Sequence, residues 1–149
     1  MSVAYQVSTN KEKLDIQLIH RFLSEESTWA KGISIEIVKK SIGNSLCFGL
    51  YADEKQIGYA RVISDFATYG VLVDVFVVNA ERGKGLSKLL INEVLAHPDL
   101  QTLRRFNLTS STAQWLYKKV GFTSLSAPET HMEIFKPNIY RDVTTSNLS

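Results

Sequence analysis

Hydrophobic and polar residues follow two different periods along this chain. In the first third, apolar residues recur every three or four positions, which predicts helices. From Leu46 onward, continuous runs rich in β-branched and aromatic residues predict strands, and after Gly85 helical and strand patterns alternate. The predicted strands are Val3–Val7, Leu46–Ala52, Gln56–Ser64, Gly70–Val78, Arg105–Thr109 and His131–Phe135. The expected order is one strand, two helices, three strands, then helix, strand, helix and strand, which is typical of a single α+β domain.

Local signals place the ends of the predicted helices. Thr9 followed by Glu12 has the spacing of a capping box and predicts the start of the first helix. The second helix is expected to end at Gly43, the third before Pro98 and the fourth at Gly121. A polar loop, Ser24–Gly32, separates the first two helices, and residues 137–149 are expected to form a loose polar tail. All 149 residues are therefore assigned to one domain.

Composition narrows the classes of function. Hydrophobic residues make up 44% of the 149 positions and charged residues 21%, and the formal net charge is +2. This balance argues against a nucleic-acid coat, and no apolar run is long enough for a membrane span or a signal peptide. The single cysteine, Cys47, excludes an internal disulfide, and the three scattered histidines give no metal-ligand spacing. We expect a cytoplasmic protein with no metal, no nucleic acid and no membrane partner.

A glycine-containing turn between a strand and a helix is the strongest candidate for ligand binding. The segment reads Arg82-Gly83-Lys84-Gly85-Leu86-Ser87. Free backbone N–H groups at a helix start attract anions, and glycines let a phosphate approach closely. The spacing does not match a Walker loop, and Lys88 stands where the dinucleotide fingerprint needs its third glycine. A plain connecting loop remains the alternative.

Two motifs together resemble the GCN5-related N-acetyltransferase (GNAT) superfamily. Arg82-Gly83-Lys84-Gly85-Leu86-Ser87 is similar to its Arg/Gln-x-x-Gly-x-Gly/Ala signature, with Ser87 in place of the last small residue. Downstream, the segment from Ala113 to Phe122 resembles the Ala-x-x-Leu-Tyr-x-x-x-Gly-Phe motif. Ser110 stands where the family often has an asparagine that contacts pantetheine. The resemblance implies a mostly antiparallel sheet flanked by helices, with acetyl-CoA as the co-substrate.

The resemblance also implies which residues bind acetyl-CoA. Its pyrophosphate would lie on the glycine turn, and its pantetheine arm where the preceding strand splays from its neighbour. A backbone N–H near Val77 or Val78 would then stabilise the oxyanion. The implied binding residues are Phe76, Val77, Val78, Arg82, Gly83, Lys84, Gly85, Leu86, Ser87 and Ser110.

Two side chains are candidates for proton transfer. Period-two alternation places Asp74 on the same strand face as Leu72, Phe76 and Val78, where an apolar environment favours a general base. The alternative is a structural carboxylate paired with Arg61 or a backbone amide. The resemblance implies that Tyr117 protonates the departing thiolate, whereas helical propensity alone would make it a core tyrosine.

The expected reaction is acetyl transfer to the primary amine of a small molecule, by direct attack in a ternary complex. Trp29 is either a core anchor or part of the acceptor pocket, and Arg61 is a second candidate for that pocket. Cys47 lies outside both motifs and most simply packs in its strand. A non-catalytic acyl-CoA sensor and a protein or peptide acetyltransferase are the alternative functions, and a homodimer is left open.

Overall fold

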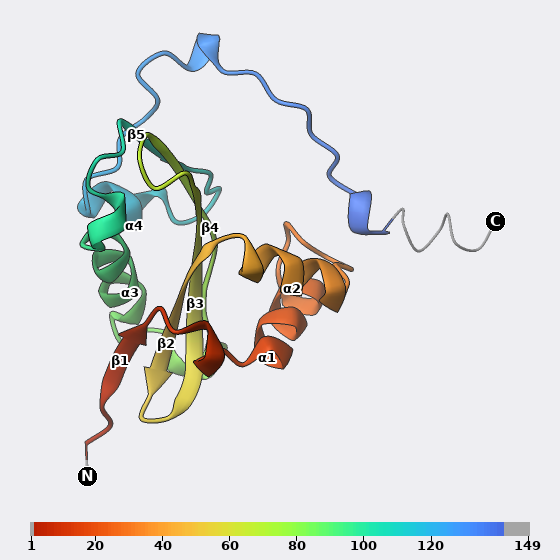
Figure 1. Cartoon of the computed structure of the whole chain (residues 1–149), viewed down its shortest axis with the longest axis vertical. Coiled ribbons are helices and arrows are strands. Elements are labelled where there is room, and N and C mark those ends of the chain that lie inside the picture. Colours follow the sequence, from red (N-terminus) through yellow and green to blue (C-terminus); the bar gives the residue numbers. More distant parts are fainter. Residues whose placement is uncertain (1, 142–149) are drawn as a thin grey trace, which may run out of the picture.

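A computed structural model describes residues 2–141 of the chain and contains one five-stranded sheet (Figure 1). The strands lie in the order β1-β2-β3-β4-β5 and all pair antiparallel except β4 and β5, which are parallel. Their bounds are β1 Tyr5–Ser8, β2 Leu46–Ala52, β3 Lys55–Ser64, β4 Tyr69–Val77 and β5 Arg105–Leu108. This confirms the predicted mixed, mostly antiparallel sheet.

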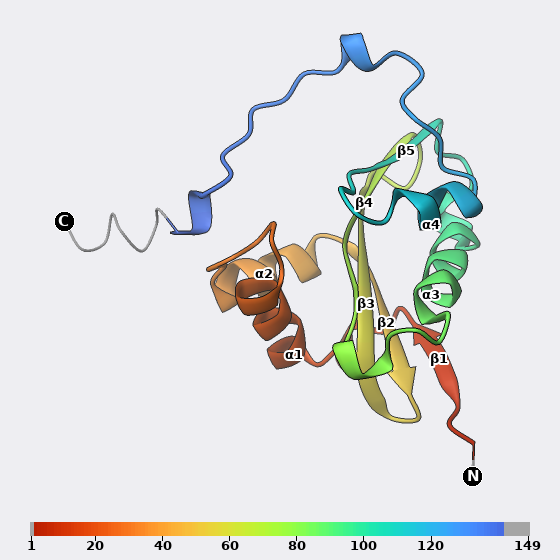
Figure 2. The ribbon, with the colours of Figure 1, turned by 180° about the vertical axis from the view of Figure 1, so that it is seen from behind.

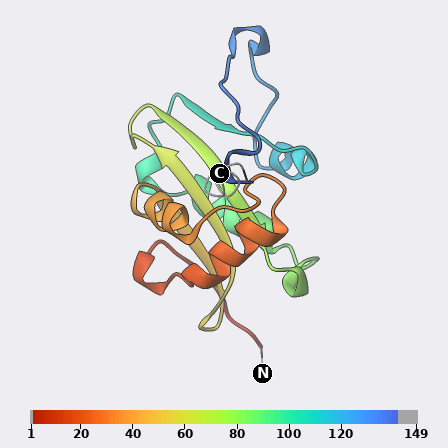
Figure 3. The same cartoon turned by 90° about the vertical axis from the view of Figure 1, so that its right-hand side faces the viewer.

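Helices cover both faces of the sheet. The helices are α1 Ile16–Arg21, α2 Ile35–Gly43, α3 Leu86–Leu95 and α4 Gln114–Lys119, and α1 continues into a π-helical turn, Phe22–Glu26. Figures 1 and 2 show α1 and α2 on one side of the sheet and α3 and α4 on the other, and Figure 3 looks onto the α1–α2 layer. Within residues 2–141, no helix has the length and hydrophobicity needed to cross a membrane.

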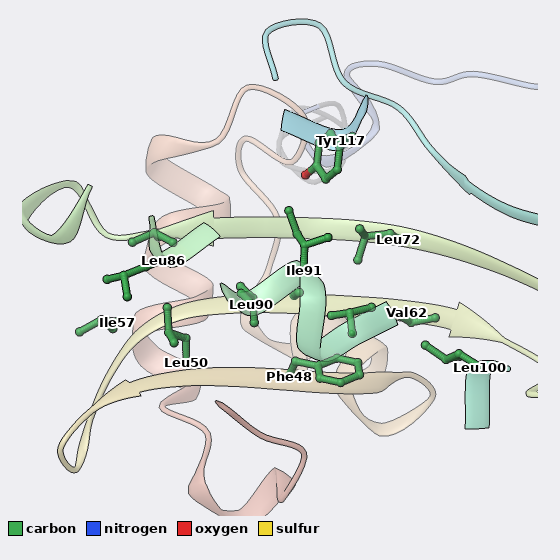
Figure 4. Packing of buried hydrophobic residues seen from close by; sticks show 13 residues of the cluster. Phe48, Leu50, Ile57, Val62, Leu72, Leu86, Leu90, Ile91, Leu100 and Tyr117 are labelled. Carbon is green, nitrogen blue, oxygen red and sulfur yellow. The ribbon is translucent and has the colours of Figure 1, made fainter. Parts of the chain in front are cut away.

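Each face of the sheet has its own hydrophobic core. Leu90, Ile91 and Val94 of α3 are fully buried against side chains from β2, β3 and β4 (Figure 4). On the other face, Ile19 and Val38 from the first two helices pack with Cys47, Tyr59 and Phe76 of the sheet. The sheet is therefore held from both sides, which fixes the path of β4 through the middle of the domain.

The start of the first helix differs from the prediction. Thr9 and Glu12 form no capping box; instead Asn10 caps a short 3-10 turn, Lys11–Lys13. The helix α1 begins after Asp15, whose carboxylate accepts a hydrogen bond from the Leu18 N–H. Because Asp and Asn side chains cap at least as well as threonine, two short elements replace the single longer one.

Within residues 2–141, the prediction of a last strand is also wrong. The segment His131–Phe135 is extended but pairs with no strand, and it belongs to a C-terminal arm, residues 126–141. Figure 1 shows this arm leaving near α4, arching past the end of the sheet and finishing on the α1–α2 side. Tyr140 is half-buried against the α1–α2 core, with its backbone beside Gly32. The rest of the predicted tail, residues 142–149, lies outside the described residues.

Two neighbouring leucines of α3 test the core on the α3 face. Leu90 is fully buried, whereas Leu89 is 36% exposed on the same helix. We expect Leu90→Ala to lower the free energy of unfolding by about 2–5 kcal/mol, because it removes packed methyl groups and leaves a cavity. The matched change Leu89→Ala should cost less than about 1 kcal/mol. Equal losses for the two variants in urea unfolding would contradict this packing.

Candidate active site

A bulge in β4 shapes the centre of the candidate site. The register between β3 and β4 shifts between Tyr59 and Arg61, and Asp74 opposite this shift has a φ of +55°. A non-glycine residue in this region costs about 1–3 kcal/mol and is concentrated at functional sites. The bulge also corrects a prediction, because Leu72 packs in the α3 core but Phe76 in the α1–α2 core. The two side chains therefore face opposite sides, since one extra residue reverses the alternation.

Beyond the bulge, β4 runs without a strand neighbour on the β5 side. The two strands pair only from Tyr69 to Leu72 of β4. The Val78 N–H donates to the Ile57 carbonyl at 2.8 Å, so it is already used toward β3. Successive N–H groups of a strand point to opposite edges, which directs the Val77 N–H toward the open side. The geometry therefore supports Val77, and not Val78, as a donor to a ligand in this opening.

The glycine turn follows directly from this open edge. Gly83 and Gly85 have φ values of +82° and +75°, and a Cβ at either would meet nothing within 4 Å. Gly85 is the N-cap of α3 and supplies no side-chain cap. The first N–H groups of α3, on Leu86, Ser87 and Lys88, consequently have no acceptor within the helix. This arrangement suits an anionic phosphate. The Leu86 side chain is buried in the core, so Leu86 offers a ligand only its backbone N–H.

The basic side chains of the turn are held by neighbouring groups. The Arg82 Nε donates to the Val77 carbonyl at 3.0 Å, so its guanidinium lies along the open edge of β4. The Lys84 Nζ lies 2.7 Å from a Glu81 carboxylate oxygen, and this hydrogen bond raises the pKa of the lysine. Both cations are therefore next to the turn, but Glu81 offsets part of the positive charge that the sequence alone indicates.

Asp74 lies in a side-chain network with two of the predicted acceptor-pocket residues. One carboxylate oxygen accepts from the Arg61 Nε at 2.8 Å, and the other accepts from the Trp29 Nε1 at 2.9 Å. The Arg61 guanidinium also donates to the Ser45 hydroxyl at 2.9 Å. The pairing with Arg61 is the structural alternative weighed for Asp74, and it fixes the orientation of the carboxylate beside the bulge.

Aromatic rings hold Trp29 next to this carboxylate. Phe22 stacks on Phe76 at 3.9 Å between ring centroids and lies 6.3 Å from the Trp29 ring. Trp29 is nevertheless 50% exposed, so much of its surface is open to solvent. Sequence reasoning missed Phe22 and Ser45 as parts of this network. The helical stripe that contains Phe22 indicates burial, but nothing in it points to a contact with β4.

Tyr117 lies on the opposite face of the sheet, in α4. It is buried beside the α3 core (Figure 4), and burial raises the pKa of its phenol. Phe122, the last residue of the second motif, packs edge-on against its ring, and no described hydrogen bond uses the phenol. The Ser110 hydroxyl accepts from the Ala113 N–H at 3.0 Å, at the turn that leads into α4. Tyr117 and Ser110 thus line the same cavity, and the hydrogen bonds of Asp74 within residues 2–141 involve neither of them.

Cys47 is placed in the core rather than at the site. Its side chain is almost fully buried, accepts a hydrogen bond from the Tyr59 hydroxyl at 3.3 Å, and has a pKa raised by burial. A buried thiol with a raised pKa is a poor nucleophile. This agrees with the expectation that Cys47 packs in its strand.

Comparison with known proteins identifies the same fold and sequence pattern. A crystal structure from Xanthomonas campestris, described as a candidate acetyltransferase of the GNAT family, is 50% identical and has a TM-score of 0.90 over 92% of this chain and 96% of its own. A predicted acetyltransferase from Clostridium acetobutylicum, solved with acetyl-CoA, is 16% identical with a TM-score of 0.64, over 90% of this chain and 96% of its own, and shows the shared fold.

Two sequence comparisons agree with the structural ones. A protein of Gibberella zeae named as a candidate acetyltransferase is 27% identical over 137 residues, covering 77% of this chain and 76% of that protein. Residues 9–135 match the family model described as "Acetyltransferase (GNAT) domain". The match spans most of the 149 residues and includes both motifs, and the chain therefore belongs to the GNAT acetyltransferase family.

Proposed function

We propose that this protein is an acetyl-CoA-dependent N-acetyltransferase that moves an acetyl group to the primary amine of a small molecule. The observation that carries the proposal is the open edge of β4 after Leu72, which leads directly into the glycine turn and the N-terminus of α3. An extended thioester with a pyrophosphate at one end matches this order of features. The acetyl-CoA in the Clostridium acetobutylicum relative adds support from the shared fold.

The backbone supplies the binding and polarising groups in this proposal. The N–H groups of Leu86 and Ser87, with Gly83 and Gly85, hold the pyrophosphate, and Ser110 faces the pantetheine arm from the far wall. The Val77 N–H then donates to the thioester carbonyl oxygen and stabilises the charge that develops there. Because these donors belong to a strand and a helix start, their positions are fixed before the ligand arrives.

The side chains carry the protons. The amine nitrogen bonds to the carbonyl carbon and loses a proton to Asp74, directly or through water. The carbon–sulfur bond breaks, and Tyr117 gives its phenolic proton to the leaving thiolate. The raised pKa of Tyr117 keeps the phenol protonated at neutral pH, as a general acid requires. Direct attack is favoured over an acetyl-enzyme because the thiol of Cys47 is buried and lies in the core.

The acceptor side presents an exposed aromatic ring, Trp29, beside a carboxylate that is 9% exposed, Asp74. The Trp29 ring and the Asp74 carboxylate form an aromatic and anionic pair, which favours a cationic amine. The Arg61 guanidinium neutralises part of the charge of the Asp74 carboxylate and fixes the orientation of that carboxylate beside the bulge. The proposed acceptor is therefore a small primary amine that binds between Trp29 and the open edge of β4.

Thiol release from acetyl-CoA with a panel of primary amines tests the function and the role of Tyr117 together. We expect acceptor-dependent release by the unmodified protein, and a fall in kcat of about a hundred-fold in Tyr117→Phe, with CoA binding unchanged. Tyr69→Phe removes a hydroxyl from the exposed part of β4 and should keep full kcat. CoA binding without release for any amine would support the sensor alternative instead. Full kcat in Tyr117→Phe would remove that tyrosine from the mechanism.

Asp74→Asn tests the proposed base. We expect kcat to fall by about a hundred-fold, because an amide cannot accept the proton that the amine loses. Asp53→Asn is the matched control, because Asp53 also has a positive φ, of 52°, but lies in the β2–β3 turn. It should leave kcat unchanged. Full kcat in Asp74→Asn, with loss of stability alone, would assign Asp74 to structure.

A further inference from the structure

Three aliphatic side chains on the α1–α2 face of the sheet belong to neither hydrophobic core. They are Ile63 of β3 and Val71 and Val73 of β4, which we call the β3–β4 patch. Val62 and Leu72, which alternate with them along the strands, are buried in the α3 core, so the three patch residues point to the other face. Within residues 2–141, the α1–α2 core does not include them either, and Ile63 is 46% exposed.

The patch residues are neighbours in the register of the sheet. Ile63 lies directly opposite Val71, and Val73 lies opposite Arg61. Opposite residues on paired strands have Cβ atoms about 4.5–5.5 Å apart, so the patch is continuous from one strand to the next. Figures 1 and 2 show α1 and α2 beside the part of the sheet that lies away from the turn between β3 and β4. The β3–β4 patch lies toward that turn, which accounts for its exposure.

The patch begins at the Asp74 carboxylate. Asp74 accepts hydrogen bonds from Trp29 and Arg61, whose side chains lie on the α1–α2 side. Its carboxylate is therefore on the same side as Val73, although consecutive residues of a strand normally face opposite ways. The extra residue of the bulge brings these two side chains together. From Val73 to Val71 the strand advances about 7 Å, so the carboxylate is followed by an apolar surface of that length.

The size and charge of the patch favour a small molecule over a protein as its ligand. A stable protein interface takes about 20–30 residues from each side, and this patch is far smaller. The patch itself carries no charge, and Arg61 beside it is engaged by Asp74 and the Ser45 hydroxyl. An apolar surface that ends at a carboxylate matches a ligand with an ammonium group at one end and a hydrocarbon body.

We propose that the acceptor is a primary amine whose hydrocarbon body, about 7 Å long, lies along the β3–β4 patch while its nitrogen lies at Asp74. This step rests on the proposed function, because it places the reacting amine of that reaction. The body displaces water from Ile63, Val71 and Val73, so binding strengthens with the length of the body. A second ammonium at the far end would lie on apolar surface and lose hydration, which disfavours diamines.

Thiol release from acetyl-CoA with three amines tests this class of acceptor. Ethylamine and n-hexylamine differ in length alone, whereas n-hexylamine and 1,6-diaminohexane differ in a second ammonium. We expect kcat/KM for n-hexylamine to exceed that for ethylamine by about tenfold, because each methylene on a half-open surface contributes about twofold. It should exceed that for 1,6-diaminohexane by about tenfold as well. Equal values for the three amines, or a preference for the diamine, would overturn the proposal.

Ile63→Glu tests the location of the hydrocarbon body. A carboxylate on the patch would attract the far ammonium of 1,6-diaminohexane, so we expect the preference for n-hexylamine over the diamine to disappear or reverse. Phe66→Glu is the matched control, because it adds the same charge at a residue that is 44% exposed in the turn between β3 and β4. It should keep the preference. The same preference in both variants would overturn the patch as the binding surface.

Methyl NMR separates this inference from the proposed function. When n-hexylamine is titrated into the CoA-bound protein, we expect the methyl signals of Ile63, Val71 and Val73 to shift. Those of Leu89, which is 36% exposed on α3, should stay in place. These shifts without thiol release from any amine would count against the proposed function alone. Unchanged methyl signals of the patch would overturn the inference, whatever the rate of thiol release.

Discussion

The site depends on one constraint, the bulge that Asp74 makes in β4. The bulge follows the part of β4 that pairs with β5, Tyr69–Leu72, and the rest of β4 has no pairing on that side and leads into the glycine turn. It also points Asp74 at Arg61 and Trp29 on the α1–α2 side. β5 itself ends at Leu108, opposite Leu72, so the end of β5 and the bulge in β4 together leave the opening. The strain of a positive φ is offset by the ion pair and by the two cores that hold β4 from both faces.

The periodic elements of the fold could be predicted because local pattern determines them. The β2–β3 hairpin, α2 ending at Gly43 and the strand leading into the glycine turn are where the sequence places them. The positive φ values at Gly83 and Gly85 are conformations that glycine adopts readily, so the backbone shape of this turn was predictable from residue type. These features need no information on tertiary contacts.

Other features depend on partners that no local pattern identifies. The extra residue at Asp74 reverses the alternation, so Leu72 and Phe76 could not be assigned to faces correctly from spacing. The contact of Trp29 with Asp74 joins residues 45 positions apart. The segment His131–Phe135 has the pattern of a strand, but no strand within residues 2–141 pairs with it.

Amide chemical shifts during titration with CoA test most directly the claim that the open edge of β4 and the start of α3 bind the co-substrate. We expect large shifts for the N–H groups of Val77, Gly83, Gly85 and Ser87, and a small shift for Val78, which remains bonded to Ile57. Unchanged shifts along this path, with changes gathered at another surface of the protein, would contradict it.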